Sequence, residues 1–392
     1  MTENLSFASS RLVGQKMFQI LALAKDLENQ GKDIIHFEIG DPDFPTPKNI
    51  KDAAINSINS DETHYTNSFG IPDLRNLACE VTLKSRGFKP LIDQVLVTPG
   101  ANFQIYLIAA CVINNGDEVI IPDPSFVSYE SIINFIGGVV VNVPLKESNY
   151  FHVDPIDIKN KITKKTKLII LNSPNNPTGS VMRESEIREI YSLCEKNNIY
   201  LISDEIYSRM IYKDSHTNFF SPSIIDNCNS KTIVINGFSK SYAMTGWRLG
   251  VVTGPANLIK KMNLLLETLV SCVPVFTQRA GIEALSCPQT EIESMVSEYR
   301  ARRDFIYTHL NQINGFDAIR PDGAFYIFPN ITKTGLSSDE ISDLILKKIN
   351  IAVAPGSIFG QHGEGYIRLC YANSMKNIES GLNRLTNYFG IK

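Results

Sequence analysis

Seven short runs rich in apolar and β-branched residues alternate with longer helical patterns through the middle of this 392-residue chain. Several of these runs are apolar throughout, as strands are when helices cover both faces of a sheet. The alternation predicts an α/β fold built on a mostly parallel, seven-stranded sheet. The expected strands are residues 95–98, 118–121, 139–143, 168–171, 200–203, 232–235 and 249–253. The clearest expected helices are residues 101–113, 184–197 and 257–270.

The alternation of strands and helices ends near Pro288, and a different pattern follows. A long helix, two short strands and a final amphipathic helix are expected there, at residues 290–311, 324–328, 366–371 and 376–388. The segment before Pro45 is expected to join this part, because chain termini often pack together. A chain this long also exceeds one ordinary core. We therefore expect a large domain over residues 46–287 and a smaller α+β domain formed by residues 1–45 and 288–392.

Composition excludes several classes of protein. The net charge is −3 and no long charge run occurs, which argues against nucleic acid or an anionic membrane as a partner. The N-terminus lacks the apolar core of a signal peptide, and no apolar run approaches the ~20 residues that span a bilayer. Seven scattered cysteines form no CxxC pair, and the six histidines show no paired spacing. We expect no metal site and reduced thiols, as in the cytoplasm.

The most informative segment is Asn236–Gly250, which lies between two expected strands. Ser239 and Ser241 flank Lys240 there, and Arg248 follows eight residues later. Small flanking residues let a bulky ligand approach the backbone, and an arginine can hold a phosphate with two hydrogen bonds. A lone loop lysine is usually a solvated surface group, so the interpretation depends on the whole segment.

Three further segments follow expected strands, at 172–179, 203–207 and 98–102. In a doubly wound sheet, ligands bind beyond the carboxyl ends of the strands, where Asn176 and Asp204 would lie. The helix start near residue 100 would offer free N–H groups to an anion. Each segment has a plainer interpretation, namely a turn, a helix cap or an ordinary strand-to-helix connection. Spacing alone does not decide between these interpretations.

Together the four segments resemble fold-type I pyridoxal-phosphate enzymes of the class I and II aminotransferase family. The resemblance rests on Ser239–Arg248, Asn172–Gly179 and Ser203–Tyr207, in the family's order, and extends from Gly40 to Arg368. It implies an aminotransferase that uses pyridoxal 5'-phosphate to move an amino group from an amino acid to a 2-oxo acid. The combination is specific for fold and cofactor but much less specific for substrate.

The resemblance also assigns catalytic roles residue by residue. Lys240 matches the lysine that forms a Schiff base with the cofactor and then moves the substrate proton. Asp204 matches the acid that keeps the pyridine nitrogen protonated. Tyr207 and Asn176 match donors to the 3′ oxygen of the ring, and Phe126 matches an aromatic side chain stacked on it.

Further roles concern the phosphate and the substrate. The expected phosphate-binding groups are the N–H groups around Gly100, Ala101 and Asn102, with Ser239 and Arg248. Tyr65 matches a tyrosine that reaches the phosphate from the partner subunit, which implies a homodimer with shared active sites. Many relatives carry a serine where this chain has Gly237, so one phosphate hydroxyl is expected to be missing. Arg368, with Gly40 and Asn176, is expected to bind the substrate carboxylate, because a guanidinium fork matches a carboxylate. Residues 321–326 and 354–360 resemble stretches near the substrate.

Substrate preference is less strongly indicated. In prokaryotic aspartate-type relatives, a lysine at the start of the helix after the first strand is implicated in pairing the distal carboxylate. Alignment places Asn102 at that position, and it supplies no charge. Arg11 and Arg209 remain as alternative cations. We therefore expect neutral amino acids to be at least as good donors as aspartate.

Three other classes of protein share some of these features. A pyridoxal-phosphate lyase or synthase of the same fold shares these motifs and stays open. A sensory module of a transcription regulator would need a DNA-binding domain ahead of the matched part, for which the sequence shows neither room nor a basic patch. A nicotinamide-dependent dehydrogenase is disfavoured because no GxGxxG segment follows an expected strand.

Overall fold

A computed structural model describes residues 6, 8–12 and 14–392. Its centre is a seven-stranded sheet in the order β2-β8-β7-β6-β5-β3-β4. The strands are β2 (Val95–Thr98), β3 (Glu118–Asp123), β4 (Val139–Pro144), β5 (Thr166–Asn172), β6 (Tyr200–Asp204), β7 (Thr232–Gly237) and β8 (Gly250–Thr253). Strand β8 is antiparallel to its neighbours β2 and β7, and the other four pairings are parallel. The predicted mostly parallel, seven-stranded sheet is confirmed.

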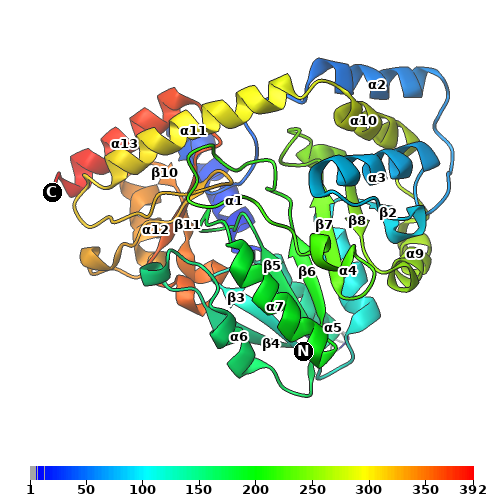
Figure 1. Ribbon diagram of the computed structural model, residues 1–392. Helices are drawn as coiled ribbons and strands as arrows, with labels where there is room; N and C mark the ends of the chain where they lie inside the picture. Colours follow the sequence, from blue (N-terminus) through cyan, green and yellow to red (C-terminus); the bar gives the residue numbers. More distant parts are fainter. Residues whose placement is uncertain (1–5, 7, 13) are drawn as a thin grey trace.

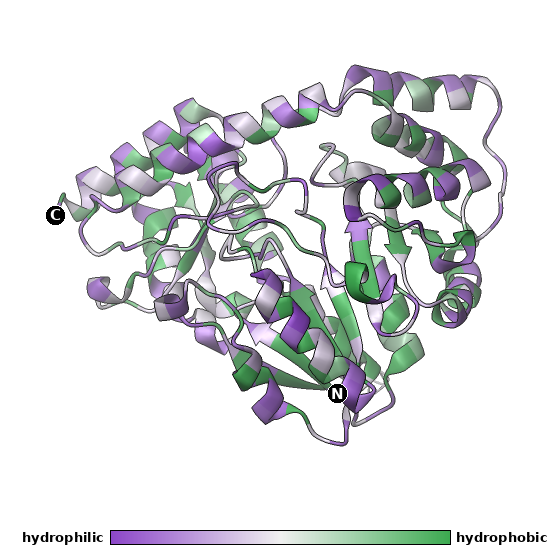
Figure 2. Cartoon of the chain, in the orientation of Figure 1, coloured by the Kyte–Doolittle hydropathy of each residue, from purple (hydrophilic) through white to green (hydrophobic). Residues whose placement is uncertain are grey.

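Helices cover both faces of this sheet, which explains the continuous apolar strands (Figure 1). Ile169 of β5 packs in the cluster that includes Ile187 and Ile190 of α7 (Glu184–Asn197). Its neighbours Leu168 and Ile170 belong instead to the cluster on the opposite face. That face is covered by α4 (Ala101–Val112), α5 (Ser128–Ile136) and α9 (Ala256–Val270), while α6 (Pro155–Lys161) packs beside α7. Figure 2 shows the hydrophobic strands in green beneath helices with hydrophilic outer surfaces.

A second group of elements surrounds two small sheets. Strand β1 (Ile35–His36) pairs with β10 (Ile351–Ala352), and β12 (Ile367–Cys370) lies between β11 (Ala354–Pro355) and β9 (Tyr326–Ile327). The helices of this group are α1 (Lys16–Asn29), α11 (Thr290–Leu310), α12 (Ser338–Ile349) and α13 (Met375–Phe389). Helix α11 runs along the top of the molecule in yellow in Figure 1, beside α13. The β1–β10 pairing brings the N-terminal segment beside the C-terminal third; the domain boundaries near residues 45 and 288 stay a prediction.

The remaining helices are α2 (Lys48–Asn59), α3 (Pro72–Arg86), α10 (Val275–Ser286) and the short α8 (Ser223–Asp226). Helix α10 packs against both α2 and α3. Across the described residues, no helix combines the length and apolarity needed to cross a membrane. All seven cysteines are free, and no cluster suited to a metal ion occurs in the described part of the chain.

Candidate active site

A cavity of about 300 Å³ lies at the carboxyl ends of β5, β6 and β7, where it also meets the small sheets. Eleven of the predicted site residues line it: Gly40, Ala101, Asn102, Phe126, Asn176, Asp204, Tyr207, Ser239, Lys240, Arg248 and Arg368. The fold thus brings together side chains that are up to 328 positions apart in the sequence. Position at the carboxyl edge of a parallel sheet accounts for this convergence.

Lys240 lies in the loop that follows β7, and its side chain is directed into the cavity. The Nζ atom donates a hydrogen bond to the carbonyl oxygen of Gly40 at 2.5 Å. Burial lowers the pKa of Lys240 to about 8, an effect that the nearby Asp41 carboxylate partly offsets. A larger fraction of this amine is therefore in the neutral, nucleophilic form at physiological pH than in an ordinary lysine.

Asp204 ends strand β6 and is buried beneath the cavity. Its carboxylate accepts hydrogen bonds from Tyr129 Oη at 2.6 Å and from the backbone N–H of Ile206 at 3.2 Å. Burial raises the pKa of Asp204 to about 6, while these hydrogen bonds act in the opposite direction. Among the described residues, the hydrogen-bond partners of the Asp204 carboxylate are neutral, and no cation contributes to its pKa shift. A positively charged group in the cavity would supply the missing countercharge.

Two asparagines fix the turn after β5. Asn172 donates through Nδ2 to the carbonyl oxygen of Asp204 at 3.1 Å and accepts from the backbone N–H of Asn176 at 2.9 Å. The side-chain oxygen of Asn176 in turn accepts from Arg368 Nη1 at 3.0 Å. The turn therefore connects the acid at the end of β6 with the arginine on β12.

Arg368 is a buried cation whose partners in the described chain are all neutral. It is 1% exposed, and its guanidinium lies 4.5 Å from the ring centroid of Tyr326 and 4.8 Å from that of Phe359. Nη2 donates to the carbonyl oxygen of Glu38 and to Met17 Sδ, and Nε has no hydrogen-bond partner there. A buried guanidinium of this kind is suited to a ligand carboxylate.

An anion site lies at the other end of the cavity. Helix α4 begins at Ala101, so its first N–H groups are free to bind an anion. The preceding Gly100 has φ 83°, and a Cβ at Gly100 would lie 2.4 Å from Arg248 Nη2. The Arg248 guanidinium is held by the carbonyl oxygen of Thr245 at 2.8 Å. Together with Ser239, these groups suit a phosphate, and only glycine allows Arg248 to approach this closely.

Several residues around the cavity were missed by sequence reasoning. Asn172, Tyr129 and Tyr326 line it, as do Met17 and Phe18 at the start of α1. Tyr326 belongs to a stretch that was expected only to lie near the substrate. Tyr129 follows Phe126 by three residues, but no local pattern indicates that it bonds Asp204.

Three predicted side chains lie outside the cavity in this chain. Tyr65 is 87% exposed, and its action on a partner subunit stays a prediction. Arg209 donates to Gln289 at 2.7 Å and lines a different cavity. Arg11 belongs to a short turn that packs on α5, where its guanidinium lies close to Gly137. Neither arginine supplies a cation to the active-site cavity.

Comparisons with known proteins agree with this geometry. Residues 32–385 match the model of the aminotransferase class I and II family. An aspartate aminotransferase of Pyrococcus horikoshii is 41% identical, over 90% of each chain. Aromatic-amino-acid aminotransferase 2 of Thermococcus litoralis is 38% identical, over 92% of each chain. The structure of Thermus thermophilus aspartate aminotransferase with maleate aligns with a TM-score of 0.94 at 32% identity, covering 98% of this chain and 100% of the other.

Proposed function

We propose that this chain, which belongs to the class I and II aminotransferase family and is a pyridoxal-phosphate-dependent aminotransferase, binds its cofactor through Lys240 and takes neutral amino acids as donors. Its substrates are an amino acid and a 2-oxo acid. The reported relatives are all named as aminotransferases, which favours transamination over the lyase or synthase alternative.

The residues around the cavity fit this cofactor. The start of α4 with Ser239 and Arg248 would hold the phosphate. Asp204, which has no cation partner among the described residues, would hold the protonated ring nitrogen. Tyr207 and Asn176 would donate to the 3′ oxygen. Phe126 lines the cavity and meets Tyr129 edge to face at 5.6 Å, so its ring is available as a flat wall for the cofactor.

The chain's own side chains would then divide the chemical work. Pyridoxal phosphate, when bound, supplies an electron sink for the α-carbon of the amino acid. The Nζ atom of Lys240 would accept the proton released from that carbon, since its pKa of about 8 lies near the working pH. The Arg368 fork would hold the α-carboxylate, and Asn176 and the Gly40 segment would fix its orientation. Positioning of this kind contributes much of the rate enhancement.

One observation supports the substrate class. In the described chain, the cations that line the cavity are Lys240, Arg248 and Arg368, and each is already assigned to the cofactor or the α-carboxylate. The remaining wall residues, which include Asn102 and Phe18, carry no positive charge. A second carboxylate would therefore enter without a partner, and an unpaired buried charge is costly.

A panel of donors tests the substrate class. We expect kcat/KM for phenylalanine, alanine or methionine to equal or exceed that for aspartate with one common 2-oxo acid. An aspartate preference above about a hundredfold, or ~2.7 kcal/mol of transition-state binding, would contradict the proposal.

We also propose a homodimer with shared active sites, located in the cytoplasm. Large apolar side chains are exposed on two helices. They are Ile55 and Ile58 of α2, which shortly precedes Tyr65, and Leu264 and Leu269 of α9. Exposed apolar surface of this kind often marks a subunit interface. The seven free thiols are in keeping with a reducing compartment.

A further inference from the structure

The hydroxyl groups of Tyr207 and Tyr326 form a buried pair at the cavity. Their oxygen atoms lie 2.7 Å apart, although 119 positions separate the residues. Both side chains are almost fully buried, and neither hydroxyl has another hydrogen-bond partner among the described residues. Each hydroxyl can therefore form hydrogen bonds only with the other tyrosine or with a ligand in the cavity.

The number of hydroxyl protons limits how many hydrogen bonds this pair can donate to a ligand. Burial raises the pKa of both Tyr207 and Tyr326 above that of an ordinary phenol, so both keep their protons at neutral pH. Two protons serve two oxygens, and one of them lies between the oxygens. If Tyr207 donates to Tyr326, Tyr207 has no proton left for a ligand. If Tyr326 donates, the Tyr207 proton stays available.

We propose that Tyr326 is a positioning residue that donates its hydroxyl proton to Tyr207 and thereby directs the Tyr207 proton toward the 3′ oxygen of the cofactor. The inference rests on the proposed function, in which Tyr207 donates to that oxygen. Linked hydrogen bonds strengthen one another, so Tyr207 becomes a better donor when it accepts from Tyr326.

The fold holds Tyr326 in place through the preceding loop. The backbone N–H groups of Gly323 and Ala324 donate to the carbonyl oxygens of Gly179 and Met210 at 2.9 and 2.8 Å. Gly179 lies three residues after Asn176, and Met210 three residues after Tyr207. The loop is thus bound to both segments that carry the proposed ring-oxygen donors.

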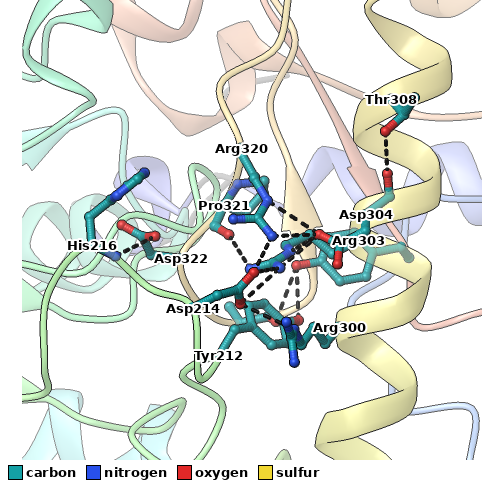
Figure 3. Close-up of polar contacts among 12 residues, drawn as sticks. Tyr212, Asp214, His216, Arg300, Arg303, Asp304, Thr308, Arg320, Pro321 and Asp322 are labelled. Carbon is teal, nitrogen blue, oxygen red and sulfur yellow. Dashed lines mark hydrogen bonds and ion pairs between the residues drawn. The ribbon is translucent and has the colours of Figure 1, made fainter.

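A cluster of charged residues holds the start of the same loop (Figure 3). Arg303 of α11 is fully buried and donates to the carbonyl oxygen of Pro321 at 3.2 Å and to Asp214 Oδ2 at 2.8 Å. Arg320 also contacts Asp214 and donates to Asp304 at 2.9 Å. Removal of one partner from such a network is strongly destabilising, so the loop has little freedom to move.

The remaining neighbours of Tyr326 leave its hydroxyl little room. A Cβ on Gly40 would lie 2.0 Å from the Tyr326 oxygen, and the ring lies against the Arg368 guanidinium. Replacement of Tyr326 by phenylalanine keeps the ring that covers Arg368 and removes only the hydroxyl. This substitution therefore isolates the hydrogen bond.

The test is the titration of the visible absorbance of the holoenzyme, which reports the proton on the lysine–cofactor linkage. Hydrogen-bond donors stabilise the negative charge on the 3′ oxygen. When a donor is removed, that charge attracts the proton on the lysine–cofactor linkage more strongly, so this proton is released only at higher pH. We expect Tyr326→Phe to raise the midpoint by roughly half a pH unit. Tyr207→Phe should raise it further. In the Tyr207→Phe background, Tyr326→Phe should have no additional effect.

Tyr371→Phe is the matched control. It removes another buried phenol, whose hydroxyl contacts Tyr212 and the carbonyl oxygen of Ala324 but not Tyr207. The control should leave the midpoint unchanged. An unchanged midpoint in Tyr326→Phe, or an equal shift in the presence and absence of the Tyr207 hydroxyl, would overturn the inference. A wild-type holoenzyme without the absorbance band would instead contradict the proposed cofactor attachment, on which the inference rests.

Discussion

The amine nitrogen of Lys240 lies 2.5 Å from the carbonyl oxygen of Gly40, 200 positions earlier in the chain. The contact joins the loop after β7, in the large sheet, to the segment after β1, in a small sheet. Gly40 also packs against Tyr326. A single backbone position thus touches the proposed cofactor lysine and the tyrosine that covers the Arg368 guanidinium.

Gly40→Ala is expected to impair the enzyme through crowding. The added Cβ would lie 2.0 Å from the Tyr326 oxygen and 2.8 Å from the ring, so the segment or the tyrosine must move. Overpacking of this size costs about 1–3 kcal/mol, and we expect kcat/KM for the amino acid to fall at least about tenfold. Gly254→Ala is the control, because its nearest contact would be an ordinary 3.4 Å. Equal kinetics in Gly40→Ala and the wild type would contradict this account of the site.

Asp204→Asn is expected to stabilise the cofactor-free protein at neutral pH. Burial raises the pKa of Asp204 to about 6. The folded protein therefore holds this proton more tightly than the unfolded chain, which stabilises the fold at low pH, and this stabilisation is lost as pH rises through 6. The shift from 3.8 corresponds to a cost on the order of 3 kcal/mol at pH 7. Urea unfolding should show the variant more stable than the wild type at pH 7, with the difference shrinking toward pH 4. A pH-independent difference would refute this explanation. The holoenzyme variant should nevertheless lose activity.

Asn102→Lys is expected to change substrate preference. Asn102 lines the cavity near the start of α4, and a lysine there would give a distal carboxylate the cation that the cavity lacks. We expect the ratio of kcat/KM for aspartate to that for phenylalanine to rise at least about tenfold, or ~1.4 kcal/mol. Asn102→Met changes the shape without adding charge and should not raise the ratio. If both variants raised it equally, charge pairing would not be the cause.

Mixed dimers are expected to recover activity from inactive parents. The exposed Tyr65 is proposed to reach the phosphate site of a partner, whereas Lys240 lies in the cavity of its own subunit. Tyr65→Ala and Lys240→Ala therefore remove residues that different subunits contribute to one site. A two-fold dimer that carries one subunit of each kind contains one site with both residues intact. We expect mixtures of the two variants, after subunit exchange, to regain up to about a quarter of wild-type activity. A fully active monomer in sedimentation would rule out the shared site.

The fold was largely predictable from sequence because its strands are covered on both faces. That burial imposes continuous apolar runs, and each of the seven expected strands lies within about two residues of an observed one. The strand expected at 324–328 is shorter, at Tyr326–Ile327, because Ala324 has φ 55° and belongs to the preceding loop. A left-handed backbone at an alanine leaves no mark in a hydrophobic pattern.

The candidate site was predictable only in part, for a related reason. Motif residues such as Lys240 and Asp204 lie at the ends of strands, where the fold itself explains their convergence. The pairs Tyr129–Asp204 and Tyr207–Tyr326 instead join residues 75 and 119 positions apart. Such pairs depend on tertiary packing, and a single sequence carries no local signal for them.

Attachment of the cofactor to Lys240 is the central claim, and borohydride reduction tests it most directly. The purified holoenzyme would be treated with sodium borohydride, which fixes the cofactor irreversibly to the amine that carries it, and then digested and mapped by mass spectrometry. We predict that the adduct lies on Lys240, and that Lys240→Ala forms no adduct while still binding the cofactor non-covalently. An adduct on another lysine, or a reduced wild-type protein without any adduct, would contradict the account.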